Sequence, residues 1–113
     1  MQFMMLIHTD QERWNRLAPE QQEQHTQHHR NLAQELIQQG RWVDGGRLHS
    51  PASGASVRID NGRVIRVDGP YAETKELVGG YYIVECADLD EACAIAARIP
   101  TAAFGTIEVR PLM

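Results

Sequence analysis

Two segments of this chain, residues 3–7 and 81–84, have the composition of β-strands that are apolar on both faces. They set the strictest condition on the fold, because such strands are typical of a sheet that is covered on both sides. Each apolar face of a sheet must pack against another layer of structure. We therefore expect a sheet that contains both segments and has two covering layers.

The first half of the chain predicts a helix, a strand and a hairpin. The helix begins near Pro19 and ends at Gly40, since proline suits the first turn of a helix and glycine commonly follows the last. Residues 41–48 are expected to form a strand. Residues 57–67 predict a β-hairpin, because Asn61 and Gly62 favour the positive φ angles of a tight turn.

The second half predicts a strand over residues 80–86, a helix and a closing strand over residues 106–110. The helix signal begins at Asp88, which suits an N-cap, and continues with acidic residues in the first turn. An apolar stripe at helical spacing is supplied by Leu89, Ala92, Cys93, Ala96 and Ile99. A chain of 113 residues has room for one domain, which we expect to span residues 1–113.

This order of elements predicts an α+β fold of the ferredoxin-like, split β-α-β type, with an inserted β-hairpin. Its antiparallel sheet would carry two helices on one face. Two helices leave the second face open, so another layer must cover it. A second copy of the chain could do so in a symmetric homodimer, which we expect. Alternatively, the hairpin could fold back over the open face.

Composition excludes several classes of partner. Eleven basic and fifteen acidic residues give a net charge of −4, without the basic face that nucleic acids or anionic lipids require. The apolar start is too short to span a membrane and lacks the features of an export signal. Cys86 and Cys93 are not in a metal or redox spacing. We expect a cytoplasmic protein that binds neither nucleic acid nor membrane.

His29 is the strongest candidate for a functional residue. At about 100° per residue it projects into the stripe of Leu32 and Leu36, so it is either a site residue or a hydrogen-bonded core histidine. His25 lies one turn earlier and could share a metal with it. No convincing third ligand is present, so we predict no metal. The two glycine pairs, at residues 45–46 and 79–80, lack the spacing of phosphate-binding loops. They suggest β-bulges or close packing of the backbone.

Residues 68–76, Asp-Gly-Pro-Tyr-Ala-Glu-Thr-Lys-Glu, are followed by Gly-Gly-Tyr-Tyr at residues 79–82. This sequence resembles the signature of the DGPF-motif branch of the YCII-related family, with Tyr71 where phenylalanine is usual. Residues 3–7 and 108–113 are similar to that family too. The resemblance implies a dimeric α+β barrel of ferredoxin-like protomers. It also implies a cleft in which a histidine meets an aspartate, and it points to His29 and Asp68.

On this basis we expect His29 to act as a general base or acid and Asp68 to orient its ring, although Asp68 could instead stabilise its own turn. Lys75, Glu73 and Tyr71 are candidate substrate contacts. The predicted function is a small-molecule enzyme that performs proton transfer, isomerisation or elimination without a cofactor. The alternative is a non-catalytic ligand- or partner-binding module, for example one that is accessory to transcription regulation.

Overall fold

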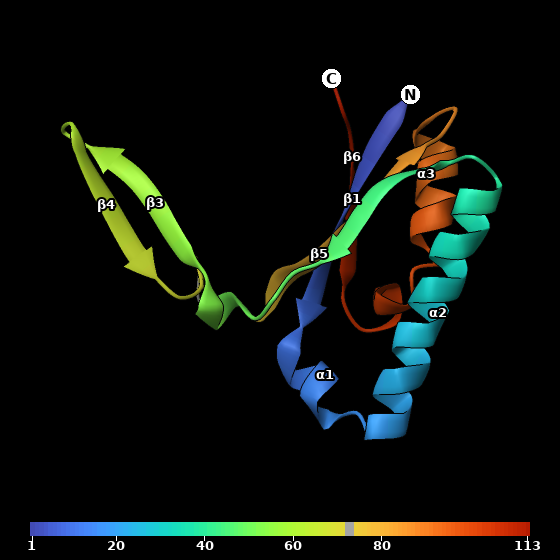
Figure 1. The fold of residues 1–113 in the computed structure, drawn as a ribbon, viewed down its shortest axis with the longest axis horizontal. Helices are drawn as coiled ribbons and strands as arrows, with labels where there is room; N and C mark the ends of the chain where they lie inside the picture. The colour runs from blue at the N-terminus through green and yellow to red at the C-terminus, as the bar shows by residue number, and fades with distance from the viewer. Residues whose placement is uncertain (72–73) are drawn as a thin grey trace.

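The computed structural model describes residues 1–71 and 74–113 as a four-stranded sheet with helices and a separate hairpin (Figure 1). In chain order the elements are β1 (Gln2–Asp10), α1 (Gln11–Arg16), α2 (Pro19–Gln38), β2 (Trp42–Arg47), η1 (Pro51–Ser53), β3 (Ala55–Asp60), β4 (Arg63–Asp68), β5 (Glu76–Glu85), α3 (Leu89–Ala96), η2 (Pro100–Ala103) and β6 (Thr106–Pro111). The predicted α+β class is confirmed.

The sheet has the order β2-β5-β1-β6, and all neighbouring strands are antiparallel. Alternate side chains of β1 enter the core, which they share with β5 and the helices. The buried apolar residues are Phe3, Met5, Ile7, Leu32, Leu36, Tyr82, Val84, Cys86, Ala92, Ile95, Ala96 and Ile99. Because α2 and α3 both contribute to this core, the two helices lie on the same face of the sheet.

The other face of the sheet has no covering layer among the described residues. Met4 and Leu6 alternate with the buried residues of β1 and are half-buried. They pair with Ile83 and Tyr81 of β5, so the four side chains form one apolar surface, called the open face below. The double-sided apolar pattern of the sequence therefore corresponds to one helix-covered face and one open face.

The hairpin of β3 and β4 forms its own two-stranded sheet and points away from the body (Figure 1). Asn61 has a φ of 49° and Gly62 a φ of 75°, which confirms the predicted turn. Val57, Ile59 and Val64 remain largely exposed. The hairpin does not fold back over the open face, so this alternative does not describe the protomer.

Helix α1 was not predicted from the sequence. Asp10 caps it, since its carboxylate accepts hydrogen bonds from the backbone N–H groups of Glu12 and Arg13 at 3.1 and 3.2 Å. Asp10 is 4% exposed and belongs to the strand that precedes the helix. Six residues with no buried side chain give no apolar period, so only this capping aspartate could have signalled the helix.

The two glycine pairs allow close packing, as the sequence suggested. A Cβ atom on Gly45 would overlap the ring of Trp42, and one on Gly80 would lie 2.9 Å from the carbonyl oxygen of Gly46. Strand β5 also begins earlier than predicted, at Glu76, and a register shift separates its pairing with Ile7 and His8. The close approach of Gly80 to Gly46 brings β2 near β5 beside the candidate site.

Candidate functional site

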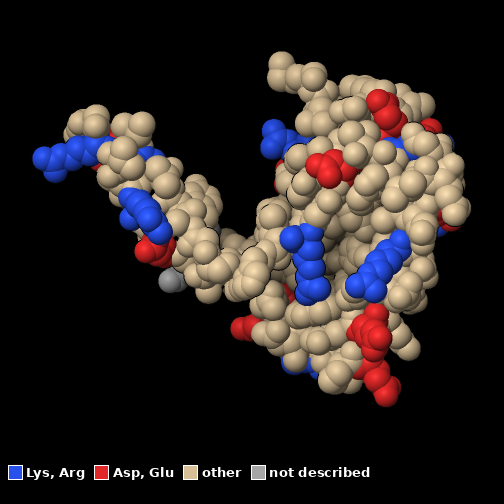
Figure 2. All heavy atoms as spheres, in the orientation of Figure 1, with Lys and Arg blue, Asp and Glu red and all other residues tan. Residues whose placement is uncertain are grey.

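A cleft of about 790 Å³ lies between α2 and the ends of β2 and β5. Figure 2 shows a hollow in the body between the strands and α2, with Lys or Arg side chains at its rim. Aromatic rings of Trp14, Trp42 and Tyr82 contribute to its walls, and His25 and His29 of α2 face it. The lining of the cleft is mainly apolar.

His29 lies where α2 meets the sheet and has three hydrogen-bonding neighbours. Its Nδ1 is 2.6 Å from the hydroxyl oxygen of Tyr82. Its Nε2 is 3.0 Å from Oγ1 of Thr101 and 3.1 Å from Nε2 of His25. Leu32 and Leu36, one and two turns later, are buried, which fixes this side of α2 against the sheet. The prediction that His29 faces inward is confirmed.

The surroundings keep the His29 ring neutral. Burial, with the charges of His25, Arg47 and His28, lowers the pKa of His29 from 6.5 to about 4. Burial, followed by the charges of Arg47 and His28, also lowers the pKa of His25. Burial raises the pKa of Tyr82 to about 12, so its hydroxyl stays protonated. At neutral pH the cleft therefore contains two uncharged imidazoles and a phenol.

A neutral His29 can satisfy its neighbours in two ways. Either the hydroxyl of Tyr82 donates to Nδ1 while Nε2–H donates to Thr101 or His25, or the ring has the opposite tautomer. Both arrangements use the same positions of the heavy atoms. A ring with a hydroxyl group at each nitrogen can take up a proton on one side and release one on the other.

The His25–His29 pair was considered as a metal site in the sequence analysis. Their Nε2 atoms are 3.1 Å apart, and His25 also contacts Thr101 at 3.2 Å. Among residues 1–71 and 74–113, no group of three or more His, Cys, Asp or Glu side chains is arranged to hold a metal. The two imidazoles are engaged with each other and with Thr101.

The structure does not bring Asp68 to His29 within one chain. Asp68 ends β4 on the hairpin, its side chain is 75% exposed, and its carboxylate accepts a hydrogen bond from Arg66 at 2.8 Å. The predicted pairing of Asp68 with His29 therefore fails within the protomer, since the hairpin leads away from the body. Tyr82 occupies the position beside Nδ1 that was expected for Asp68.

The other predicted contacts lie at the edge of the cleft or beyond it. Tyr71 is 90% exposed. Lys75 lies 3.9 Å from the carboxylate of Asp10, and its side chain is 71% exposed. Glu73 lies outside the described residues. Among the described residues of the 68–76 segment, Pro70 is the one that lines the cleft.

Several important residues were not identified from the sequence. Thr101 sits in the short η2 turn, where nothing marks it as functional. Arg47 and Trp14 come from separate elements, and the guanidinium of Arg47 lies 5.4 Å from the centre of the Trp14 ring. The glycine pair beside Arg47 was the available signal for that wall, because it allows β2 to approach β5 closely.

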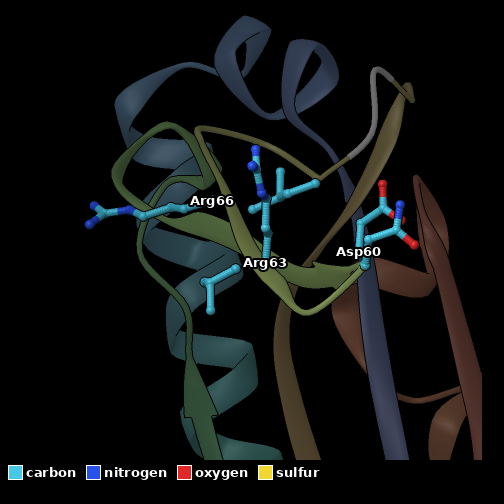
Figure 3. Close-up of a pocket in the computed structure, with 6 residues that line it drawn as sticks. Asp60, Arg63 and Arg66 are labelled. Carbon is cyan, nitrogen blue, oxygen red and sulfur yellow. The ribbon is translucent and has the colours of Figure 1, made fainter.

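A second hollow, of about 840 Å³, lies on the outer part of the hairpin and is open to solvent. Figure 3 shows Asp60, Arg63 and Arg66 pointing in different directions there. These side chains do not converge on one point, and no aromatic residue or histidine joins them. The hollow has no arrangement suited to catalysis, so the cleft at His29 is the candidate site.

No helix in the described parts of the chain is long and apolar enough to cross a membrane.

Two comparisons with known proteins identify the family of this chain. The family model described as the YCII-related domain matches residues 1–113. An uncharacterised protein of Rhizobium meliloti (strain 1021) is 32% identical over 114 residues, which cover 99% of this chain and 92% of that protein. The full-length family match and this relative show that the chain belongs to the YCII-related family.

Proposed function

We propose that this protein is an enzyme that transfers protons on a small organic molecule bound in the cleft, without a cofactor. The observation that carries the proposal is a neutral, half-buried His29 whose Nδ1 lies 2.6 Å from the hydroxyl of Tyr82 inside an open cleft. Neutral imidazole is the form that accepts a proton, and a phenol of raised pKa donates hydrogen bonds. Isomerisation and elimination both use such a pair.

His29 is the acid–base group in this proposal. Its Nδ1–H donates to the oxygen of Tyr82, which fixes the ring, leaves Nε2 as the base and leaves the O–H of Tyr82 to donate to a developing oxyanion. Thr101 and His25 hold the other ring nitrogen. A substrate that displaces one of these neighbours gains access to Nε2. Asp68, Tyr71, Lys75 and Glu73 are not required.

Hydrogen–deuterium exchange tests this proposal. Phenylpyruvate and a carboxylated butenolide lactone have acidic C–H bonds, and their proton NMR signals disappear when deuterium from the solvent replaces hydrogen. The protein is expected to accelerate this loss over buffer alone for at least one of them. Binding of both compounds without acceleration would contradict catalysis. That outcome would favour the ligand-binding module, including an accessory role in transcription regulation.

We also propose that the protomer is ferredoxin-like and belongs to the DGPF-motif branch. The strand order β2-β5-β1-β6 with antiparallel neighbours supports the first assignment, since it is the order of a split β-α-β sheet. The sequence at residues 68–76 supports the second. Both cysteines are free thiols, which supports a reducing compartment such as the cytoplasm.

A homodimer completes this proposal, with the open faces of two sheets packed together as in a dimeric α+β barrel. Met4, Leu6, Tyr81 and Ile83 would then become buried. The exposed apolar hairpin supports the same conclusion, because an isolated two-stranded hairpin is only marginally stable in water. A second copy would give it a surface to pack on.

Substitution of Leu6 by Glu is expected to convert the dimer to a monomer, because a charge at the centre of the interface would be buried without a partner. Light scattering at micromolar concentration should give twice the chain mass of 12.8 kDa for the wild type and the mass of one chain for Leu6→Glu. Ile37→Glu is the matched control, since Ile37 is already exposed on α2. A wild-type protein with the mass of one chain would refute the dimer.

A further inference from the structure

The charged side chains that line the cleft are basic, although the protein as a whole is acidic. The chain carries a net charge of −4, yet no Asp or Glu is among the described residues that line the cleft. The lining does contain two arginines, Arg30 and Arg47. Neither takes part in an ion pair among the described residues, whereas Arg41, Arg66 and Arg98 each have a carboxylate partner. The cleft therefore offers uncompensated positive charge to a ligand.

Arg47 is better placed than Arg30 to act on the histidines. It ends β2 beside the glycine pair, and its guanidinium lies over the face of the Trp14 ring at 5.4 Å. Arg47 is exposed, and this cation–π contact favours a position of its guanidinium over the Trp14 ring. Its charge also acts at both His25 and His29, where it helps to lower the pKa of each ring. Arg47 thus lines the cleft from β2, near enough to the histidines of α2 for its charge to act on both rings.

The remaining walls are suited to an apolar, flat body. The rings of Trp14, Trp42 and Tyr82 line the cleft together with Ile7 and Leu77. Such surfaces stack on aromatic or unsaturated groups. A planar guanidinium matches the two oxygens of a carboxylate. The described residues that line the cleft include neither a glycine-rich loop at a helix start nor a third Lys or Arg that would suit phosphate.

We infer that the cleft binds a small carboxylate with a flat, apolar body, and that Arg47 anchors the carboxylate group. This inference specifies the ligand class of the site in the proposed function and uses the same cleft. Arg30, at the exposed rim, adds to the attraction without a defined contact. The role that the sequence suggested for Lys75 as a carboxylate clamp falls to Arg47, because Lys75 lies beside Asp10.

Binding of such a ligand would also change the pKa of His29, the proposed base. Without a ligand, the positive charge of Arg47 disfavours protonation of His29. A bound carboxylate offsets this charge, so protonation of the ring becomes easier and its pKa rises towards its ordinary value. A general base works best when its pKa lies near the working pH. The substrate would therefore strengthen the base at the moment when it is bound.

Benzoate is a suitable probe because it combines a carboxylate with a flat ring. Both tryptophans of the chain line the cleft, so their fluorescence reports on occupancy. We expect benzoate to bind and benzamide, its uncharged analogue, to bind at least about tenfold more weakly. Arg47→Gln should weaken benzoate binding by a similar factor. Arg66→Gln, on the hairpin, is the matched control and should leave benzoate binding unchanged.

A second readout does not depend on affinity. NMR titration of the histidine rings should show that benzoate raises the pKa of His29, and that Arg47→Gln raises it in the absence of any ligand. Equal binding of benzoate and benzamide, or an Arg47→Gln variant that binds benzoate as the wild type does, would overturn the inference. Tighter binding of phenyl phosphate than of benzoate would overturn the choice of carboxylate.

These outcomes are separate from the test of catalysis. If benzoate binds through Arg47 but the protein accelerates no proton exchange, the ligand class stands and the enzymatic proposal fails. If exchange is accelerated but Arg47→Gln changes neither the KM nor benzoate binding, the enzymatic proposal stands and the carboxylate anchor fails.

Discussion

Replacement of His29 by Gln is expected to lower the rate of any proton exchange that the protein catalyses by about 10²–10⁴-fold, the usual contribution of a general acid–base group. Glutamine can still hydrogen-bond to the hydroxyl of Tyr82, so the local packing is largely preserved. It cannot accept a proton at neutral pH. The rate constant should therefore fall, while the affinity for benzoate should change little.

His28→Gln is the matched control, because His28 is the next residue on α2 but is exposed and does not line the cleft. Its exchange rate should equal that of the wild type.

Tyr82→Phe should also slow exchange, since it removes the hydroxyl group that lies 2.6 Å from Nδ1 of His29 and orients the ring. The double variant His29→Gln/Tyr82→Phe should lose little more than His29→Gln, because the two residues act as a unit. Additive losses, or a His29→Gln variant as active as His28→Gln, would contradict the proposed relay.

Local patterns in the sequence were sufficient to predict much of the fold. The Asn61–Gly62 turn follows from backbone preferences of two adjacent residues, and the inward face of α2 follows from the spacing of Leu32, Leu36 and His29. The sheet order, by contrast, is a long-range property. It depends on pairings such as Leu6 with Tyr81, for which the sequence offered an analogy with known folds.

The candidate site was predicted only in part for the same reason. His29 could be identified from its position on an apolar helix face. Its actual partners, Tyr82 and Thr101, are 53 and 72 residues away in the chain, and no local signal links them to it. Asp68 was assigned by resemblance, but the direction of the hairpin is set by the segments that flank it. That direction places Asp68 beside Arg66 rather than at the cleft.

The neutral state of His29 has a measurable effect on stability in acid. Its pKa is about 4 in the folded protein, below the ordinary value of 6.5 that applies to the unfolded chain. Between these two values the unfolded chain binds more protons than the folded protein, so stability falls as the pH falls. The contribution of His29 is fully present above pH 6.5 and is lost completely below about pH 4. His25, whose pKa is also lowered, acts in the same direction.

The free energy of unfolding that His29 loses in acid can be measured by comparing the wild type with His29→Gln. Each pKa unit corresponds to about 1.4 kcal/mol, which gives an upper limit of about 3 kcal/mol for His29 and about 2 kcal/mol once partial exposure is taken into account. Urea unfolding at about pH 7.5 and about pH 4.5 should show that wild type loses more free energy of unfolding than His29→Gln, by about 1–2 kcal/mol. His28→Gln should lose nearly as much as the wild type, because that ring is exposed and its charge is the smallest of the causes that lower the pKa of His29. Carboxylates titrate equally in all three proteins, so the difference isolates His29. Equal losses in the wild type and His29→Gln would mean that the ring is solvated and has its ordinary pKa, which would contradict the buried His29–Tyr82 pair on which the proposed mechanism rests.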